Sequence, residues 1–397
     1  MQYEISDKMA GLKPSIIREL LKQMSDPTLI SFAGGNPAQD SFPAGEIARF
    51  SDELLRGQPA AVLQYSVSEG VPAVREAMKT FLDRRWKLVR DTDELIVTSG
   101  SQQILDIAAK VLCNEGDTVA VEDPAFLSAY LSFRSYGAKL VGVPMRADGV
   151  DLAALEAAFA ASPRPRFFYC IPNFQNPTGR TMSLAKRKAV YALAVKYGVP
   201  VLEDDPYGEL RFTGEDLPPI KAFDSEGAVL YAASFSKILC PGMRLAACVA
   251  HKDLARHLVV AKQSADVHTT VWSQRICGEM LAQVDMDAHI RALRALYRDK
   301  AQCMMDALDE LCPQLTYEKP EGGMFLWASL PAGIPMQAYV QACLRQKVAL
   351  VPGNAFQVDE GAPCQSFRMN FSSPSKENIR LGVQRMAGVL AQFACAG

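Results

Sequence analysis

Lys237 is the residue whose setting in this sequence most favours chemistry. It lies in the segment SFSKILCPGMR, residues 234–244, directly after the apolar run 228–233. That run predicts a buried strand, so Lys237 follows a strand end in a loop that contains Pro and Gly. A partly desolvated lysine amine can lose its proton and attack a carbonyl group. A solvated loop lysine is the alternative, because most lysines are exposed.

Polar residues that could share a site with Lys237 follow other predicted strands. Ser101 and Gln102 open a predicted helix, where free backbone N–H groups and the helix dipole could bind a phosphate. Asp204 follows a buried strand, and an acid there needs a cationic partner. Asn176 lies in a loop after another strand. Each also has an ordinary explanation, as a helix cap or a turn residue.

Together these residues meet the needs of one cofactor, pyridoxal 5'-phosphate. This cofactor requires a lysine for a Schiff base, an acid facing its ring nitrogen, a cradle for its phosphate and a flat side chain against its ring. The combined order of these residues is far more specific than any one of them.

The surrounding elements predict an α/β protein with a mostly parallel sheet of seven strands, flanked by helices. Short apolar strands alternate with helices from about residue 94, which is typical of a sheet covered on both faces. Ligands of such sheets collect at the carboxyl ends of the strands. We expect strands at 94–98, 118–122, 139–143, 166–171, 199–203, 228–233 and 245–250, and helices at 101–113, 125–136, 152–160 and 183–197.

The two ends of the chain have a different pattern. Helical spacing of apolar residues predicts helices at 14–24 and 70–86. After about residue 285, a long helix and short strands predict a smaller α+β region. We expect an N-terminal helix and loop (1–45), a large cofactor-binding domain (46–285) and a small C-terminal α+β domain (286–397). In the last of these we place a helix at 286–311 and strands at 316–318, 324–328 and 368–371.

Composition excludes several classes of function. The 397 residues include 42 Lys and Arg against 44 Asp and Glu, which leaves no positive surface for nucleic acid or an anionic membrane. The ten cysteines and four histidines form no metal-binding spacing, so we expect no metal and reduced thiols. No window approaches the roughly 20 apolar residues of a membrane span, and the start lacks a signal-peptide pattern. We expect a cytoplasmic protein.

The motifs, in their order, resemble the class I aminotransferases of the aspartate-aminotransferase fold, which is fold type I. These motifs are SGSQQ, NPTG, DDPY and SFSK, with an arginine seven residues after the lysine. The similarity runs over essentially the whole chain. Within the family, SIIRELLK, SFAGGNPAQDSFP and QYSVSEG resemble the branch of 2-aminoadipate, kynurenine and broad-specificity aromatic aminotransferases. The same branch forms the C-terminal half of certain transcription regulators.

The resemblance implies a role for each site residue. Lys237 would form the Schiff base and carry the proton at the substrate Cα, and Asp204 would keep the ring nitrogen protonated. The phosphate would be held by Ser101, Gln102, Ser234, Ser236 and Arg244, with Tyr65 from the neighbouring subunit. The ring hydroxyl would be bound by Asn176 and Tyr207, and the substrate α-carboxylate by Arg368, Asn176 and the Gly35 backbone. Arg18, on the predicted N-terminal helix, is the candidate for a distal carboxylate.

Two residues depart from the family pattern, and two arginines have a second explanation. Phe126 stands where the family usually has a ring-stacking tyrosine, and it can stack but has no hydroxyl. Asn36 replaces the usual leucine of the family's GGLP motif. It places an amide near the expected side-chain pocket, so the family's preference for apolar substrates is in question here. Arg18 could be an exposed helix arginine and Arg368 a surface arginine.

We therefore expect a pyridoxal-phosphate-dependent aminotransferase, a homodimer with active sites at the subunit interface. It would move the amino group of 2-aminoadipate or an aromatic, branched or similar amino acid to 2-oxoglutarate by a ping-pong mechanism. A β-lyase or decarboxylase is an alternative, because the first steps are shared. A ligand-sensing regulator module would need a basic segment before the fold, and the residues before Gly34 are not basic.

Overall fold

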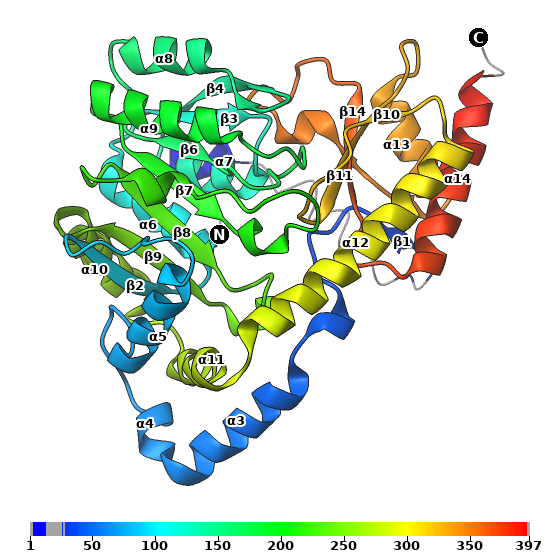
Figure 1. Ribbon diagram of the computed structural model, residues 1–397. Helices are drawn as coiled ribbons and strands as arrows, with labels where there is room; N and C mark the ends of the chain where they lie inside the picture. Colours follow the sequence, from blue (N-terminus) through cyan, green and yellow to red (C-terminus); the bar gives the residue numbers. More distant parts are fainter. Residues whose placement is uncertain (1–2, 13–25, 27, 395–397) are drawn as a thin grey trace.

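The large sheet organises the middle of the chain in the computed structural model, which describes residues 3–12, 26 and 28–394 (Figure 1). Its strand order is β2-β9-β8-β7-β6-β3-β4-β5. The strands are β2 (Asp93–Thr98), β3 (Thr118–Asp123), β4 (Lys139–Arg146), β5 (Gly149–Val150), β6 (Phe168–Cys170), β7 (Val201–Asp205), β8 (Val229–Ser234) and β9 (Ala246–His251). All seven predicted strands are present, and the two-residue β5 extends the sheet to eight.

The central strands of this sheet run parallel. The pairs β4 with β3, β3 with β6, β6 with β7 and β7 with β8 are parallel. β9 runs antiparallel to both β8 and β2. Because helices cover both faces, the central strands are almost continuously buried, as in β8, where the first five residues are buried and apolar.

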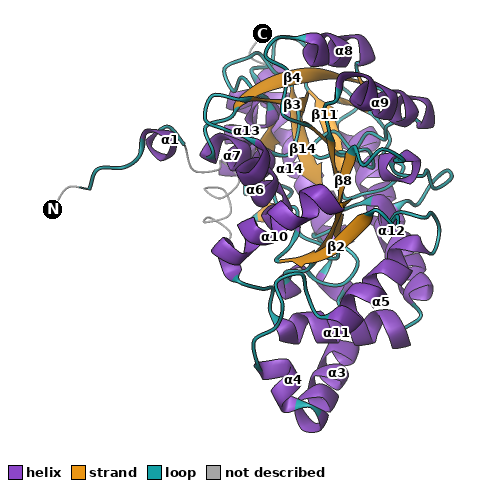
Figure 2. Ribbon diagram, turned by 90° about the vertical axis from the view of Figure 1, so that its left-hand side faces the viewer, coloured by secondary structure: helices purple, strands orange, loops and turns teal. Residues whose placement is uncertain are grey.

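Helices pack on both faces of the large sheet (Figures 1 and 2). α8 (Leu152–Ala160) and α9 (Leu184–Tyr197) contact each other and share a core with strand residues such as Phe168. α6 (Ser101–Leu112) lies between α7 (Leu127–Ser135) and α10 (Lys252–Asp266). The sequence predicted α6, α7, α8 and α9 but not α10.

A second, antiparallel sheet forms the smaller part of the molecule, with strand order β10-β11-β14-β13. The long helix α12 (Met286–Leu311) has the predicted bounds and connects the two parts (Figure 1). The other elements here are β10 (Thr316–Tyr317), β11 (Phe325–Ser329), α13 (Met336–Arg345), β13 (Val351–Pro352), β14 (Ser366–Asn370) and α14 (Lys376–Ala394). Near the N-terminus, β1 (Ile30–Ser31) pairs in parallel with β12 (Val348–Ala349), so residues 30–31 join the smaller part.

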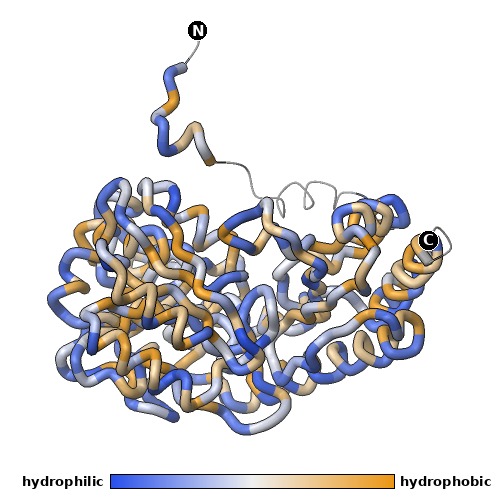
Figure 3. Tube along the Cα trace, turned by 90° about the horizontal axis from the view of Figure 1, so that it is seen from above, coloured by the Kyte–Doolittle hydropathy of each residue, from blue (hydrophilic) through white to orange (hydrophobic). Residues whose placement is uncertain are grey.

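The remaining helices cover one end of the large sheet. α5 (Pro72–Asp83) corresponds to the helix predicted at 70–86, and α11 (Val271–Gln283) packs against α5, α3 (Ala44–Gly57) and α4 (Pro59–Leu63). α1 (Asp7–Ala10) lies at the outside, near α7 (Figures 2 and 3). The predicted helix at 14–24 and its Arg18 lie outside the described residues. No helix in the described part of the chain combines the length and apolarity that crossing a membrane requires.

Candidate active site

Four chain segments with the predicted site residues meet at one edge of the large sheet. β6, β7 and β8 run parallel, so their carboxyl ends lie side by side. Asn176 follows β6, Asp204 lies within the last two residues of β7, and Lys237 follows β8. β2 points in the same direction as β8, because β9 is antiparallel to both. The segment that begins at Ser99 therefore reaches the same edge.

Lys237 is enclosed rather than solvated. Its side chain is half-buried, and its Nζ donates a hydrogen bond of 2.7 Å to the carbonyl oxygen of Gly35. Burial chiefly, together with the positive charges of Arg368 and Arg244, lowers the pKa of Lys237 to about 8. A neutral, nucleophilic amine is therefore available at much lower pH than in an ordinary lysine. This enclosure does not fit the alternative of a solvated loop lysine.

Arg368 comes to the same place from the second sheet, on β14. It is only 2% exposed, and its guanidinium lies 4.2 Å from the ring centre of Phe325 and 4.9 Å from that of Phe356. Nη1 donates to Asn176 Oδ1 at 2.7 Å and Nη2 to the Ala33 carbonyl at 2.6 Å. Its Nε has no partner among the described residues. The alternative of a surface arginine is therefore wrong.

The environment of Arg368 suits it to bind an anion. Its hydrogen-bond partners are an amide and a carbonyl oxygen, so no carboxylate neutralises it in the described part of the chain. Burial lowers the pKa of Arg368 to about 10, which still leaves the group charged at neutral pH. A buried cation without a counter-charge is costly, and a bound carboxylate would offset that cost with charge-assisted hydrogen bonds.

Asp204 presents one free carboxylate oxygen at this edge. Oδ2 accepts a hydrogen bond of 3.0 Å from the hydroxyl of Tyr169, and Oδ1 is buried with no partner among the described residues. Burial raises the pKa of Asp204 to about 7, and the neighbouring Asp205 adds to the effect. A cationic N–H facing Oδ1 would supply the missing partner and favour the ionised form.

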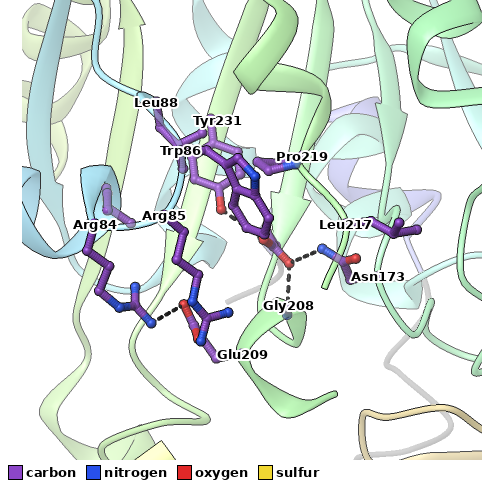
Figure 4. A pocket seen from close by; sticks show the side chains of 12 residues that line it. Arg84, Arg85, Trp86, Leu88, Asn173, Gly208, Glu209, Leu217, Pro219 and Tyr231 are labelled. Atoms are coloured by element: carbon purple, nitrogen blue, oxygen red, sulfur yellow. Dashed lines mark hydrogen bonds and ion pairs between the residues drawn. The ribbon is translucent and has the colours of Figure 1, made fainter. Parts of the chain in front are cut away.

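Asp205, the next residue, lines a separate small cavity together with Asn173 and Tyr231, which are labelled in Figure 4. Its Oδ1 accepts from Asn173 Nδ2 at 3.0 Å and from the backbone N–H of Gly208 at 2.9 Å, and Oδ2 accepts from Tyr231 at 2.8 Å. The cavity beside it has about 30 Å³, enough for one or two waters. Successive strand residues point to opposite faces, so Asp205 is a satisfied structural acid while Asp204 faces the site.

The N-terminus of α6 forms a cradle beside Lys237. Gly100 precedes Ser101 with a φ of +81°, and a Cβ there would overlap the guanidinium of Arg244. Arg244 Nη2 donates to the Ser99 carbonyl at 3.3 Å. α6 has 12 residues, so its first turn offers free N–H groups and a positive dipole end. This arrangement suits a phosphate.

The remaining predicted phosphate ligands differ in their placement. Ser234 ends β8, and its Oγ accepts from the backbone N–H of Ser236 at 3.3 Å. The Gln102 amide instead donates to Ser132 Oγ at 2.7 Å and to the Ser128 carbonyl at 3.2 Å. Its side chain therefore holds α7, which leaves the backbone N–H groups of α6 for an anion.

Three aromatic residues complete the predicted set. Tyr207 is buried, with its ring edge-on to that of Phe325 at 5.7 Å, and burial raises its pKa. Phe126 directly precedes α7 and is half-buried. Tyr65 is 82% exposed, and its ring lies edge-on to that of His268, at 5.7 Å between ring centres. The structure of one chain thus does not bring Tyr65 into the cluster.

Sequence reasoning did not single out Tyr169 or the Ala33 carbonyl. A tyrosine in a strand that is otherwise apolar is a usable signal, because a buried hydroxyl needs a partner. The pairing of Tyr169 with Asp204 across adjacent strands is visible only once the register is known. The Ala33 carbonyl carries no sequence signal, because any residue type has one.

Comparison with known proteins identifies relatives over almost the whole chain. The family model described as aminotransferase class I and II matches residues 27–386. The chain is 37% identical to aromatic-amino-acid aminotransferase 1 of Thermococcus litoralis, over 99% of this chain and 95% of the relative. It is 38% identical to 2-aminoadipate transaminase of Thermus thermophilus, over 98% of this chain and 96% of the relative.

A solved structure shares both the fold and the sequence similarity. The α-aminoadipate aminotransferase of Thermus thermophilus, complexed with N-(5'-phosphopyridoxyl)-L-leucine, superimposes with a TM-score of 0.91. It is 36% identical, and the match covers 99% of this chain and 98% of that one.

Proposed function

The chain belongs to the class I and II aminotransferase family, and we propose that it moves the α-amino group of an amino acid to 2-oxoglutarate by a ping-pong mechanism. It is a pyridoxal-phosphate-dependent enzyme. The observation that carries the proposal is the meeting of Lys237, Asp204 and Arg368 at one sheet edge, each with capacity for a further partner or reaction. In the ping-pong order, the donor leaves as a 2-oxo acid before 2-oxoglutarate enters.

The residues present fit pyridoxal phosphate. The unpartnered Oδ1 of Asp204 matches the protonated ring nitrogen, and the cradle at Gly100 matches the phosphate. The residues that would hold the cofactor are Ser101, Gln102 through the helix backbone, Phe126, Asn176, Asp204, Tyr207, Ser234, Ser236 and Arg244. When bound, pyridoxal phosphate draws electrons from the amino acid and so makes its Cα proton acidic.

The chain's own residues then bind the substrate and move the proton. Arg368 binds the α-carboxylate as a planar fork, and Asn176 holds that fork in place. With its carboxylate fixed, the amino acid presents its Cα to Lys237. The Lys237 amine takes the Cα proton and later returns it, which its lowered pKa permits near neutral pH.

The donors that we propose are 2-aminoadipate and aromatic or branched amino acids. This proposal is supported by the substrates for which the relatives are named and by the leucine adduct in the solved structure. Asn36 is exposed near the site, and its backbone carbonyl accepts from Ser372 Oγ at 2.8 Å. The role of Arg18 toward a distal carboxylate stays a prediction, because Arg18 lies outside the described residues.

We also propose a homodimer with active sites at the subunit interface. Its support is the group of exposed apolar side chains around Tyr65, which includes Leu63 at 73%, Val67 at 51% and Trp272 at 38% exposed. With the dimer we propose a division of the chain into residues 1–45, 46–285 and 286–397. Its support is that, in the sequence, all strands of the large sheet come before α12 and all strands of the second sheet come after it.

A panel of amino donors tests this function. Purified enzyme with pyridoxal phosphate, 2-oxoglutarate and each donor should form glutamate and the matching 2-oxo acid, with parallel lines in double-reciprocal plots. Release of ammonia, carbon dioxide or pyruvate without glutamate would instead identify the lyase or decarboxylase alternative.

A further inference from the structure

The Gln175 side chain ties together two loops at the proposed site. Its Nε2 donates to the Pro124 carbonyl at 2.7 Å. Its Oε1 accepts from the backbone N–H and the hydroxyl of Thr178, at 3.1 and 2.7 Å. Gln175 has no exposed surface, so each of these bonds is made away from water.

Glu122 anchors this bridge from β3. Its Oε2 accepts from the backbone N–H of Ile171 at 3.0 Å and from Gln175 Nε2 at 3.3 Å. Glu122 is also fully buried, and its backbone carbonyl accepts from the Tyr130 hydroxyl at 2.7 Å. The carboxyl group therefore connects the ends of β3 and β6 to the amide of Gln175.

The two loops carry residues of the proposed cofactor site. Pro124 lies two residues before Phe126, the expected stacking residue, and Gln175 directly precedes Asn176. Asn176 in turn holds the Arg368 guanidinium at 2.7 Å. A shift of the Gln175 amide would therefore move Phe126, Asn176 and Arg368 relative to one another.

We propose that Gln175, anchored by Glu122, is a positioning residue that fixes Asn176 and Phe126 in the geometry the reaction needs. This inference rests on the proposed function of the site. Gln175 does not touch the reacting atoms itself. It acts through Asn176, and through Asn176 on the carboxylate fork of Arg368.

The charge state of Glu122 follows from its surroundings. Burial raises the pKa of Glu122 to about 8, against smaller opposing effects of the hydrogen bonds from Ile171 and Gln175. The titratable groups that face it are Tyr130 on α7 and Tyr169 and Cys170 on β6, and burial raises their pKa values as well. Burial therefore favours the protonated form of Glu122, and a glutamine has nearly the same shape as that form and the same charge.

The test compares Gln175→Ala with Gln274→Ala in the holoenzyme. Gln274 is an equally buried glutamine that also bridges two backbone groups, the Val71 N–H and the Thr269 carbonyl. Both variants should lower the Tm. Gln175→Ala alone should raise the KM for amino donors by about tenfold or more and change the visible circular dichroism of the bound cofactor. The proposal would be overturned if both variants lost the same amount of Tm and both kept the KM and the circular dichroism of the wild type.

Two further variants keep the test decisive if Gln175→Ala does not fold. Thr178→Val removes one donor to Gln175 and should shift the KM and circular dichroism in the same direction, while Thr178→Ser should restore both. Wild-type values in Thr178→Val would contradict the proposal. If the wild-type enzyme forms no glutamate from any donor, the proposed function is wrong. If the wild type is active but the Gln175 and Thr178 variants have its KM and circular dichroism, only the positioning role of Gln175 is wrong.

Glu122→Gln tests the anchor separately. Glu122 has a pKa of about 8 in the folded protein and about 4.5 in the unfolded chain. Between these pH values the folded state binds the proton more tightly, so the free energy of unfolding of the wild type falls as the pH rises. Glu122→Gln removes this penalty, so its Tm relative to wild type should rise from pH 5 to pH 8, with an unchanged KM at pH 7. Two results would contradict a protonated Glu122 as the anchor of Gln175. One is a higher KM of Glu122→Gln than of wild type at pH 7, and the other is a Tm difference between the two proteins that does not change with pH.

Discussion

At the scale of single residues, the site depends on polar groups whose partners are incomplete. Asp204 and Asp205 are adjacent in sequence, yet Asp205 accepts three hydrogen bonds, whereas Asp204 has one oxygen without a partner among the described residues. Arg368 is buried with no carboxylate partner among the described residues. Because an unpaired buried charge is costly, such groups indicate where ligands bind.

Replacing Arg368 by lysine tests its proposed role. Lysine keeps the positive charge but loses the planar fork, and charge-assisted hydrogen bonds contribute about 1.5–3 kcal/mol each. We expect kcat/KM for glutamate to fall by about 10²-fold or more in Arg368→Lys. Arg256→Lys, an exposed control, should match wild type. A change of less than about threefold in Arg368→Lys would show that another group binds the α-carboxylate.

The residues that we propose to react or bind directly could be recognised in the sequence, but those that we propose to position them could not. Lys237, Asp204 and Arg368 occur in short motifs that could be interpreted without a structure. Gln175 and Tyr169 contact partners in other segments of the chain, such as Pro124 and Asp204, and those pairs exist only after the sheet forms. The structure of one chain does not show whether Tyr65 belongs to a site, because its side chain is exposed.

At the scale of elements, the start of α6 brings the phosphate cradle together. Three groups lie next to one another there: the first turn of α6, Gly100 with its positive φ, and the guanidinium of Arg244. The strands of the alternating region were predicted well because they are short apolar runs, and the helices were predicted from their place between those runs rather than from strong apolar periodicity. α3, α10 and α11 were not predicted, although α3 and α10 each have an apolar and a polar face, which is a signal that the sequence carries.

The cradle predicts that Gly100→Ala impairs cofactor binding. A Cβ at Gly100 would meet the Arg244 guanidinium, whereas Gly116, with a similar φ of +86°, has open space around it. Both substitutions carry backbone strain of order 1–3 kcal/mol. We expect the Kd for pyridoxal phosphate to rise at least about tenfold in Gly100→Ala and to stay unchanged in Gly116→Ala. Equal Kd values in both variants would mean that the cradle tolerates displacement of Arg244.

At the scale of the whole molecule, the site exists only where three parts of the chain meet. The large sheet supplies Lys237 and Asp204, the second sheet supplies Arg368, and the N-terminal loop supplies the carbonyls of Ala33 and Gly35. The two parts are also joined by a bidentate ion pair, in which Arg180 contacts Glu318 at 2.7 and 2.8 Å. A relative shift of the two sheets would therefore separate Lys237, the proposed proton-transfer group, from Arg368, the proposed carboxylate-binding group.

The proposed dimer predicts complementation between two variants. Lys237→Ala should be inactive, and Tyr65→Phe should bind pyridoxal phosphate more weakly because it loses a phosphate ligand. When the two are unfolded and refolded together, each mixed dimer should regain one site with an intact Lys237 and an intact Tyr65. Turnover at limiting cofactor should then exceed that of the two variants measured apart. No gain, in dimers confirmed by light scattering, would place Tyr65 outside the partner's site.

Reduction of the native holoenzyme with borohydride, followed by peptide mass spectrometry, tests the central claim most directly. The half-buried amine of Lys237, with its pKa lowered to about 8, should carry the phosphopyridoxyl group in the wild type. Lys237→Ala should carry none and should lose transamination. A phosphopyridoxyl group found on another lysine of the wild type, or retained in Lys237→Ala, would contradict the account.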